Sequence, residues 1–231
     1  MKSLNFAYFL FFFIAIGCSN STDSNENTNP NTNATVTDVD GNIYQTITIC
    51  NQIWAQKNLQ VSHYKNGDIV PQVTDAIQWK NLTTGAWCYY NNDPSTESTY
   101  GKLYNWYAVV DPRGLAPAGW HVPSDAEYNT LIENCLGGFG VAGGKMKEIG
   151  TTNWDSPNTL ATNSCGFTAL PGGYRTFSGN FDYIRKQGNF WSTTEENATR
   201  GKFLSLLNTI SNATRGDIYK FYGFSVRCVK D

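Results

Sequence analysis

The chain has 231 residues, a formal net charge of −2 at neutral pH, 14 % aromatic residues and only 16 % charged residues. This aromatic-rich, charge-poor composition excludes a coiled coil and predicts an ordered core rather than a disordered main body. The balance of charge offers no basic field for a nucleic-acid backbone, and without a run of 18 apolar residues we expect no ordinary membrane span.

The N-terminal segment predicts an export signal. Lys2 supplies a positive charge, and the almost wholly apolar residues 4–16 that follow have the length of a signal-peptide core. The run ends at Gly17-Cys18, which resembles the bacterial lipobox, although Ala15 stands where Leu is usual. We therefore expect residues 1–17 to be a lipoprotein signal peptide and Cys18 to carry the lipid. The alternative is an ordinary cleaved signal peptide.

Residues 18–37 are rich in Asn, Ser and Thr and contain almost no apolar side chains. Because such a segment buries too little surface to offset the entropy of ordering, we expect a disordered tether, followed by a single domain at residues 38–231. Acyl chains on Cys18 would make the membrane a partner of the chain. The predicted location is extracytoplasmic, on the outer membrane or the cell surface.

Five cysteines remain once Cys18 is set aside, and export would place them where disulfides form. Because five is an odd number, we expect one or two structural disulfides together with at least one free or intermolecularly paired thiol. The sequence has no C-x-x-C motif, and only His63 and His121 offer nitrogen ligands. We therefore predict neither a metal site nor a cofactor.

The first half of the domain is predicted to consist of short strands and turns. Residues 38–41 have the composition of a turn. They also resemble the start of a calcium-binding loop, but the later ligand positions of that motif are missing, so we favour a turn. Apolar and polar residues alternate over residues 43–49, as in a strand, and the pattern continues around Ile53-Trp54. Residues 87–90 are a further strand candidate.

The clearest predicted helix begins at Ser124, which forms a capping-box pattern with Glu127. Apolar residues then recur at helical spacing over residues 128–136, and Gly137-Gly138 ends the pattern. A second, shorter helix is expected over residues 141–149.

The last part of the chain is predicted to contain a long loop and several strands. Residues 151–173 are rich in Asn, Thr, Gly and Pro, and a long loop inside a compact domain is usually functional. Strands are expected at residues 190–192, 203–207 and 224–229. A domain that opens and closes with strands often pairs them, so we expect the terminal strands to be neighbours.

Six sequence blocks, in order, resemble the Fibrobacter succinogenes major paralogous domain. They are GAWCYYNN at 85–92, YNWYAV at 104–109, GWHVPSDAE at 119–127, GFTALPGGYR at 166–175, FWSTTE at 190–195 and YGFSVRC at 222–228. The resemblance covers about residues 38–231. It implies an exported protein or lipoprotein of Bacteroidetes-like bacteria, without implying a molecular role.

The order of these blocks also resembles, more distantly, the order of motifs in C-type-lectin-like domains and in the formylglycine-generating enzymes, which share their fold. This resemblance implies an α+β, C-type-lectin-like fold: an antiparallel sheet with paired terminal strands, one or two helices and long irregular loops. By the same analogy Cys135 would bridge to Cys228. The calcium-dependent sugar triplets of C-type lectins and the closely spaced cysteine pair of the formylglycine enzymes are missing, so neither of those activities is implied.

Two aromatic segments are candidate ligand contacts. Trp154, followed by Asp155, lies in the predicted long loop and is the most attractive exposed aromatic. Trp191 precedes Glu195 and Glu196, and a ring face beside carboxylates suits a sugar; the alternative, which we favour, is that Trp191 belongs to the core.

No Ser or Cys lies at a sequence spacing that would indicate a nucleophile with a supporting base. We therefore expect no catalytic residue and no enzymatic activity. The favoured function is a lipid-anchored binding module that recognises a glycan or protein through residues 151–173 and 195–212. The alternatives are a structural cell-envelope display protein without a small ligand and, less favoured, an enzyme.

Overall fold

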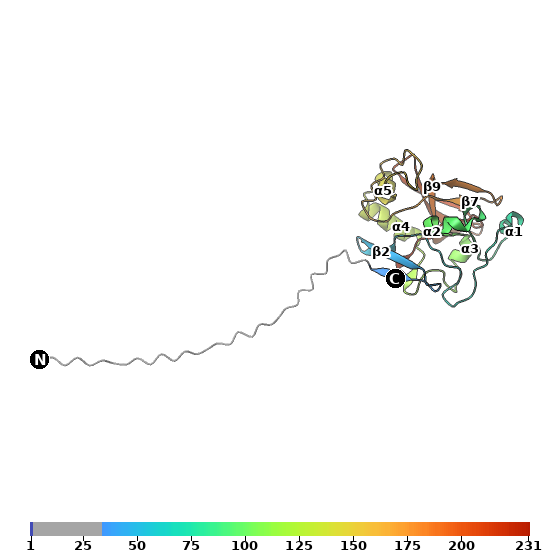
Figure 1. Cartoon of the computed structure of the whole chain (residues 1–231), viewed down its shortest axis with the longest axis horizontal. Helices are drawn as coiled ribbons and strands as arrows, with labels where there is room; N and C mark the ends of the chain where they lie inside the picture. Colours follow the sequence, from blue (N-terminus) through green and yellow to red (C-terminus); the bar gives the residue numbers. More distant parts are fainter. Residues whose placement is uncertain (2–33) are drawn as a thin grey trace. The chain divides into compact units, whose positions relative to one another are not determined.

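The first sheet of the computed structural model, which describes Met1 and residues 34–231, has the strand order β1-β2-β3-β12-β6. All neighbours in it are antiparallel. Its strand β2 is labelled in Figure 1. The strands are β1 (Thr35–Thr37), β2 (Ile43–Ile49), β3 (Gln52–Ala55), β6 (Trp120–His121) and β12 (Val229–Lys230). The alternating pattern of residues 43–49 therefore forms the predicted strand, and Ile53-Trp54 lies in its hairpin partner.

The folded chain begins before residue 38. Strand β1 pairs with β2, with Thr35 opposite Gln45 and Thr37 opposite Ile43, and the Thr46 hydroxyl donates to the Ala34 carbonyl. The expectation that the tether extends to residue 37 is wrong at this end, because these β-branched residues gain a strand partner in β2. The predicted signal peptide, the lipidated Cys18 and the rest of the tether lie outside the described residues.

The second sheet has the strand order β11-β10-β9-β7-β8. Its pairs are antiparallel except β7 with β9, which is parallel. The strands are β7 (Gly172–Arg175), β8 (Phe181–Ile184), β9 (Gln187–Asn197), β10 (Arg200–Leu207) and β11 (Ala213–Tyr219). Strands β4 (Trp87–Cys88) and β5 (Leu103–Tyr104) form a small separate ladder. The described chain is thus a mixed α/β fold with curled antiparallel sheets and few helices.

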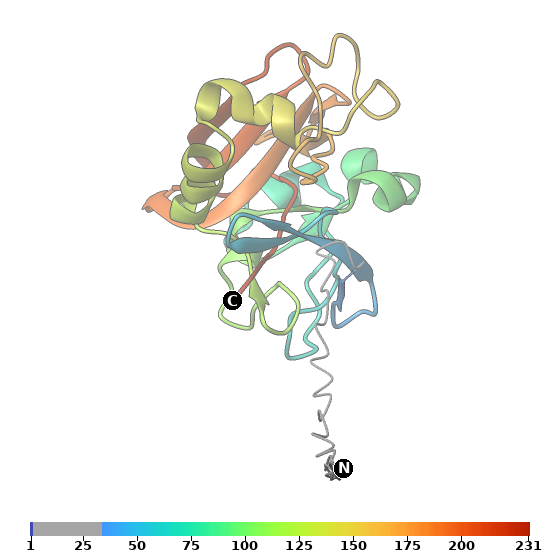
Figure 2. The ribbon, with the colours of Figure 1, turned by 90° about the vertical axis from the view of Figure 1, so that its left-hand side faces the viewer.

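Helices α4 (Asp125–Asn129) and α5 (Phe139–Met146) cover one face of the β9–β11 ribbon (Figure 2). Helix α4 has the predicted capping box in full: Ser124 Oγ accepts from the Glu127 N–H, and the Glu127 carboxylate accepts from the Ser124 N–H. It continues as the π-helix η3 (Thr130–Cys135), and Gly137 and Gly138 follow at positive φ.

The remaining helices are short. They are α1 (Ala76–Lys80), η1 (Tyr90–Asn92), η2 (Pro94–Thr96), α2 (Glu97–Tyr100) and α3 (Trp106–Val109). Within residues 34–231, the structure contains no helix with the length and apolar character needed to cross a membrane.

The closing segment, residues 223–229, connects the three sheets. Gly223 bridges to Arg175 of β7, Phe224 to Tyr104 of β5, and Ser225 to Phe190 of β9. Only Val229–Lys230 is a regular strand, and it pairs with β3 and β6. A continuous strand over 224–229 and direct pairing of the terminal strands are therefore both wrong, because the segment exchanges partners at nearly every residue and β3 lies between β2 and β12.

Buried cations hold the irregular parts of the chain. Lys147 Nζ donates to the carbonyls of Thr159, Leu207 and Ile210. Burial lowers the pKa of this amine to about 8. The Arg227 guanidinium, also fully buried, donates to the carbonyls of Ala55, Phe167 and Thr168. Residues 151–171 are a loop, as predicted, whereas Gly172 and Gly173 of the predicted loop belong to β7. The two cations hold this loop at Thr159, Phe167 and Thr168.

Candidate functional site

The two tryptophans considered as ligand contacts are core residues. Trp154 is 0 % exposed, and its indole N–H donates to the Ala169 carbonyl at 3.0 Å. Trp191 is also 0 % exposed, and its indole N–H donates to the Tyr104 carbonyl at 2.8 Å. The expectation that Trp154 is exposed is therefore wrong: the loop folds back so that its indole packs in the core and its one donor finds a carbonyl. Neither ring offers a face to a ligand.

The three candidate carboxylates each pair with a cation. Asp155 contacts Arg185 at 2.9 Å, Glu196 contacts Lys202 at 2.9 Å, and Glu195 contacts the buried Lys220 at 2.5 Å. Because the three cations lie in different elements, the structure does not gather these carboxylates with the two tryptophans into one patch.

The disulfide joins Cys135 to Cys50, with their Cα atoms 6.0 Å apart. The expected bridge from Cys135 to Cys228 is wrong, because η3 ends beside the turn between β2 and β3, where Cys50 lies. Cys228 is a free buried thiol, and burial raises its pKa to about 12. Cys88 and Cys165 are also free thiols.

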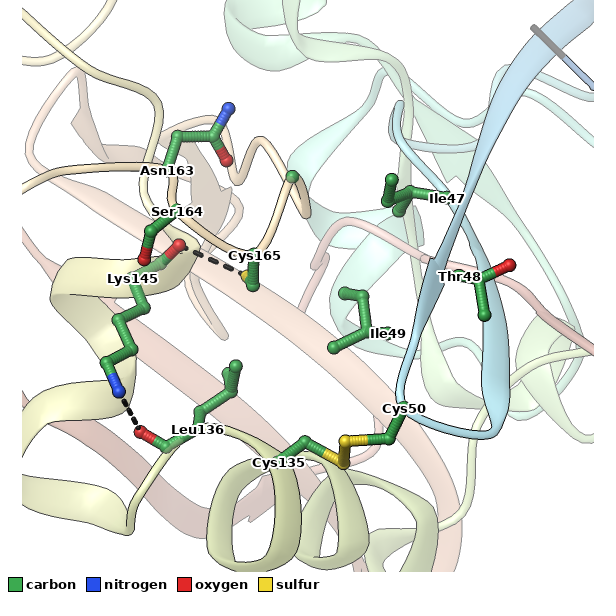
Figure 3. Close-up of a pocket in the computed structure, with 11 residues that line it drawn as sticks. Ile47, Thr48, Ile49, Cys50, Cys135, Leu136, Lys145, Asn163, Ser164 and Cys165 are labelled. Carbon is green, nitrogen blue, oxygen red and sulfur yellow. Dashed lines mark hydrogen bonds between the residues drawn. A yellow bond between two sulfur atoms is a disulfide. The ribbon is translucent and has the colours of Figure 1, made fainter. Parts of the chain in front are cut away.

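A cavity of about 610 Å³ lies beside this disulfide (Figure 3). Its polar side chains are committed to the protein: Lys145 Nζ donates to the Leu136 carbonyl, the Cys165 thiol donates to the Lys145 carbonyl, and Asn163 binds Thr168. Burial raises the pKa of the Cys165 thiol. This cavity offers an inert thiol and few free polar groups, so it does not resemble a binding site.

A cluster of aromatic side chains lies at the surface of the second sheet. It comes from β7, the following turn, β8 and the end of β11 with its turn, and we call it the aromatic cluster: Tyr174, Phe177, Tyr183, Tyr219, Phe221 and Tyr222. All six are exposed or half-buried, with Phe177 and Tyr183 50 % and Tyr219 43 % exposed. An exposed group of this size is unusual for a surface that contacts only water.

Five rings of the aromatic cluster form a continuous column. Tyr183 stacks on Tyr174 with centroids 5.6 Å apart, and Tyr219 stacks on Phe221 at 5.2 Å. Tyr222 connects the two pairs, at 6.2 Å from Tyr174 and 6.1 Å from Phe221. Burial, with a smaller contribution from Asp182, raises the pKa of Tyr174 to about 12, so its hydroxyl is protonated at neutral pH.

Buried groups hold the aromatic cluster from beneath. The Arg175 guanidinium donates to the carbonyls of Val73, Thr74 and Gly179, which fixes the turn that carries Phe177. The Trp79 indole N–H donates to the Phe221 carbonyl at 2.6 Å. These contacts fix the backbone that carries the rings.

A cavity of about 430 Å³ opens at the Tyr183 end of the column, and it is lined by Tyr90, Phe181, Asp182, Tyr183, Ile184 and Lys186. Within residues 34–231, neither the Asp182 carboxylate nor the Lys186 ammonium has a hydrogen-bond or ion-pair partner. The volume falls in the usual range of ligand sites, and the two free charges could orient a polar ligand.

The backbone around this cavity is unusual. Tyr183 has φ +61°, although it lies in strand β8, and Gly173 across from it has φ +62°. A Cβ at Gly173 would lie 2.6 Å from the Asp182 carbonyl oxygen and 2.7 Å from the Tyr90 ring. Bulky residues rarely adopt positive φ, and such strain gathers at functional sites. In the sequence, the one indication of this close approach of the Gly173 backbone to its neighbours is the glycine pair Gly172-Gly173 in the segment GGYR.

The described residues thus define an α/β domain with a preformed surface aromatic cluster beside a polar cavity. One family, described as the Fibrobacter succinogenes major domain, matches residues 47–230 by its sequence model. The chain belongs to this family, as its six sequence blocks predicted. No curated protein and no solved structure is significantly similar to the chain.

Proposed function

We propose that the chain is a lipid-anchored, extracytoplasmic binding module that recognises a glycan through the aromatic cluster. The observation that carries this proposal is the gathering of six exposed or half-buried rings from separate segments into one supported surface. Aromatic faces suit the apolar C–H faces of sugar rings, and the tyrosine hydroxyls supply polar contacts. The loop at residues 151–171 is less suitable, because Trp154, which was expected to bind there, is buried. Residues 195–212, also expected to be a loop, instead comprise the end of β9, strand β10 and the adjoining turns.

The anchor in this proposal is Cys18, and the membrane is the partner reached through its lipid. The apolar residues 4–16, followed by Gly17-Cys18, support export to the outer membrane or the cell surface. No catalytic step is proposed. A C-type-lectin-like fold is the finer architecture that we propose, supported by the capped helix after Trp120-His121 and by a closing segment that runs through the centre of the sheets.

The test is a glycan array probed with the full-length chain in detergent, with and without calcium. A Phe177→Ser/Tyr183→Ser double variant should weaken binding by about tenfold or more, because each aromatic contact contributes about 0.5–1.5 kcal/mol. The matched control is Ile149→Ser/Leu160→Ser, which removes two apolar side chains that are 66 % and 71 % exposed and lie outside the cluster. Failure to bind any glycan would remove this proposal and favour a display protein without a small ligand.

A further inference from the structure

The column of rings has one open end. Because the rings stack on one another, most ring faces in the column are covered by a neighbour. At one end the Arg200 guanidinium lies over Tyr219, 5.0 Å from its centroid. At the other end, among the described residues, Tyr183 stacks with no aromatic ring except Tyr174, and its side chain is 50 % exposed. The column therefore offers a ligand one ring face, at its Tyr183 end, rather than several ring faces along its length.

The open end coincides with the polar cavity. Tyr183 lines it together with Asp182 and Lys186, the two charged groups that have no partner within residues 34–231. A carboxylate accepts hydrogen bonds and an ammonium donates them. A ligand hydroxyl does both, so a polyhydroxylated ring can satisfy the two charges while its apolar face covers Tyr183. An apolar peptide would instead bury both charges without partners, which is costly.

We infer that the cavity beside Tyr183 is a binding site for a single pyranose ring, either a free sugar or the terminal unit of a glycan. This inference rests on the proposed function and narrows it to one ring and three side chains. Tyr183 stacks on the sugar, Asp182 accepts from its hydroxyls, and Lys186 donates to its oxygens. Because only one ring face is open, units beyond the first gain little contact, and affinity does not depend on chain length.

The experiment measures binding of methyl glucoside, methyl galactoside and methyl mannoside, and of oligosaccharides of the same sugars, by calorimetry with the full-length chain in detergent. At least one methyl glycoside should bind, and its oligosaccharide should bind within about threefold of the same affinity. Tyr183→Ala should weaken binding by about tenfold, whereas Tyr183→Phe should retain it, because the ring face is kept. Asp182→Asn and Lys186→Gln, at exposed positions, should each weaken binding without changing the thermal midpoint.

The matched control is Ile149→Ser/Leu160→Ser, which removes two exposed apolar side chains outside the aromatic cluster and should leave affinity unchanged. Tyr219→Ala, at the opposite end of the column, should weaken binding less than Tyr183→Ala. Equal losses for Tyr183→Ala and Tyr219→Ala would overturn the single-ring site, as would an oligosaccharide that binds more than about tenfold tighter than its monosaccharide. Array binding that survives Tyr183→Ala but fails in the Phe177→Ser/Tyr183→Ser variant would also overturn it, while leaving the proposed function in place. The absence of binding to every array glycan would remove both.

Discussion

Arg175 and Gly223 exchange two main-chain hydrogen bonds, in which the N–H of each donates to the carbonyl of the other at 2.9 Å. This bridge places Tyr174 of β7 beside Tyr222 of the closing turn, with their ring centroids 6.2 Å apart. The Arg175 side chain meanwhile reaches into the core, where Trp79 packs 4.5 Å below its guanidinium. One residue therefore connects the exposed rings to the interior.

Arg175→Met should destabilise the fold by about 2–4 kcal/mol, because it leaves buried carbonyls at Val73, Thr74 and Gly179 without their donor. Urea denaturation measures the change, and near-ultraviolet circular dichroism should report loosened packing of the aromatic cluster. The control is Arg113→Met, whose side chain is 40 % exposed and forms its ion pairs at the surface. It should change stability much less than Arg175→Met, because exposed ion pairs contribute little. Equal effects would contradict the role assigned to Arg175.

Gly179→Ala should destabilise the fold because a Cβ there would lie 2.3 Å from the Cβ of Ala76, and Gly179 also has φ +83°. The matched control is Gly41→Ala, at φ +85° with nothing within 4 Å of the added carbon. The control measures the conformational strain alone, and we expect Gly179→Ala to cost at least about 1 kcal/mol more in urea denaturation. Similar losses of unfolding free energy in the two variants would show that Ala76 moves aside without an energetic cost.

Cys50→Ser should lower stability by about 2–4 kcal/mol, because the disulfide to Cys135 spans 85 residues and restricts the unfolded chain. Chemical reduction of the wild type should have the same effect and should add nothing in the variant. Cys165→Ser is the control and should keep the response to reduction. Recovery of a Cys135–Cys228 peptide pair in non-reducing mass mapping would contradict the assigned connectivity.

Stability should fall as the pH rises above about 6.5 because of His121. Burial alone lowers the pKa of this imidazole, but hydrogen bonds to Asp231 at 2.6 Å and to Glu127 at 2.7 Å raise it overall above its ordinary value of 6.5. A pKa that is higher in the folded state gives stability that is complete below the unfolded pKa and is lost as the pH rises through the folded pKa. Denaturation at a series of pH values should show this loss.

His121→Gln removes the titrating group and should flatten this part of the stability profile. Asp231→Asn should lower the pKa of His121 as measured by NMR, because one of its two carboxylate partners is lost. A profile unchanged by His121→Gln would assign the pH dependence to another group.

The sequence predicted the elements whose causes are local. The capping box of Ser124 and Glu127 and the alternation over residues 43–49 each depend on neighbours a few positions away, so their patterns are complete within a short window. The polar side chains of the long loop likewise predicted its irregular backbone. The extension of the fold to Thr35 was missed because a strand of three residues is too short to show a periodicity.

The features that define the candidate site depend on distant contacts. The rings of Tyr174, Tyr183 and Tyr222 meet only because the Arg175–Gly223 bridge joins two segments, and no local spacing records that pairing. Trp154 was expected to be exposed because its loop is polar, yet a buried carbonyl acceptor and the amine of Lys147, 5.6 Å from its ring, accommodate the indole inside. The partner of Cys135 was likewise set by the packing of η3 against the β2–β3 turn.

Folding of the domain depends on the closing segment. Since residues 223–229 supply the shared partner of β3, β5, β7 and β9, none of these ladders is complete without them. A chain truncated before residue 223 would leave strands of all three sheets unpaired and the apolar contacts of the buried Phe224, Val226 and Cys228 unfilled, so it should be readily degraded by proteases. Formation of the three sheets is thus cooperative through this one segment.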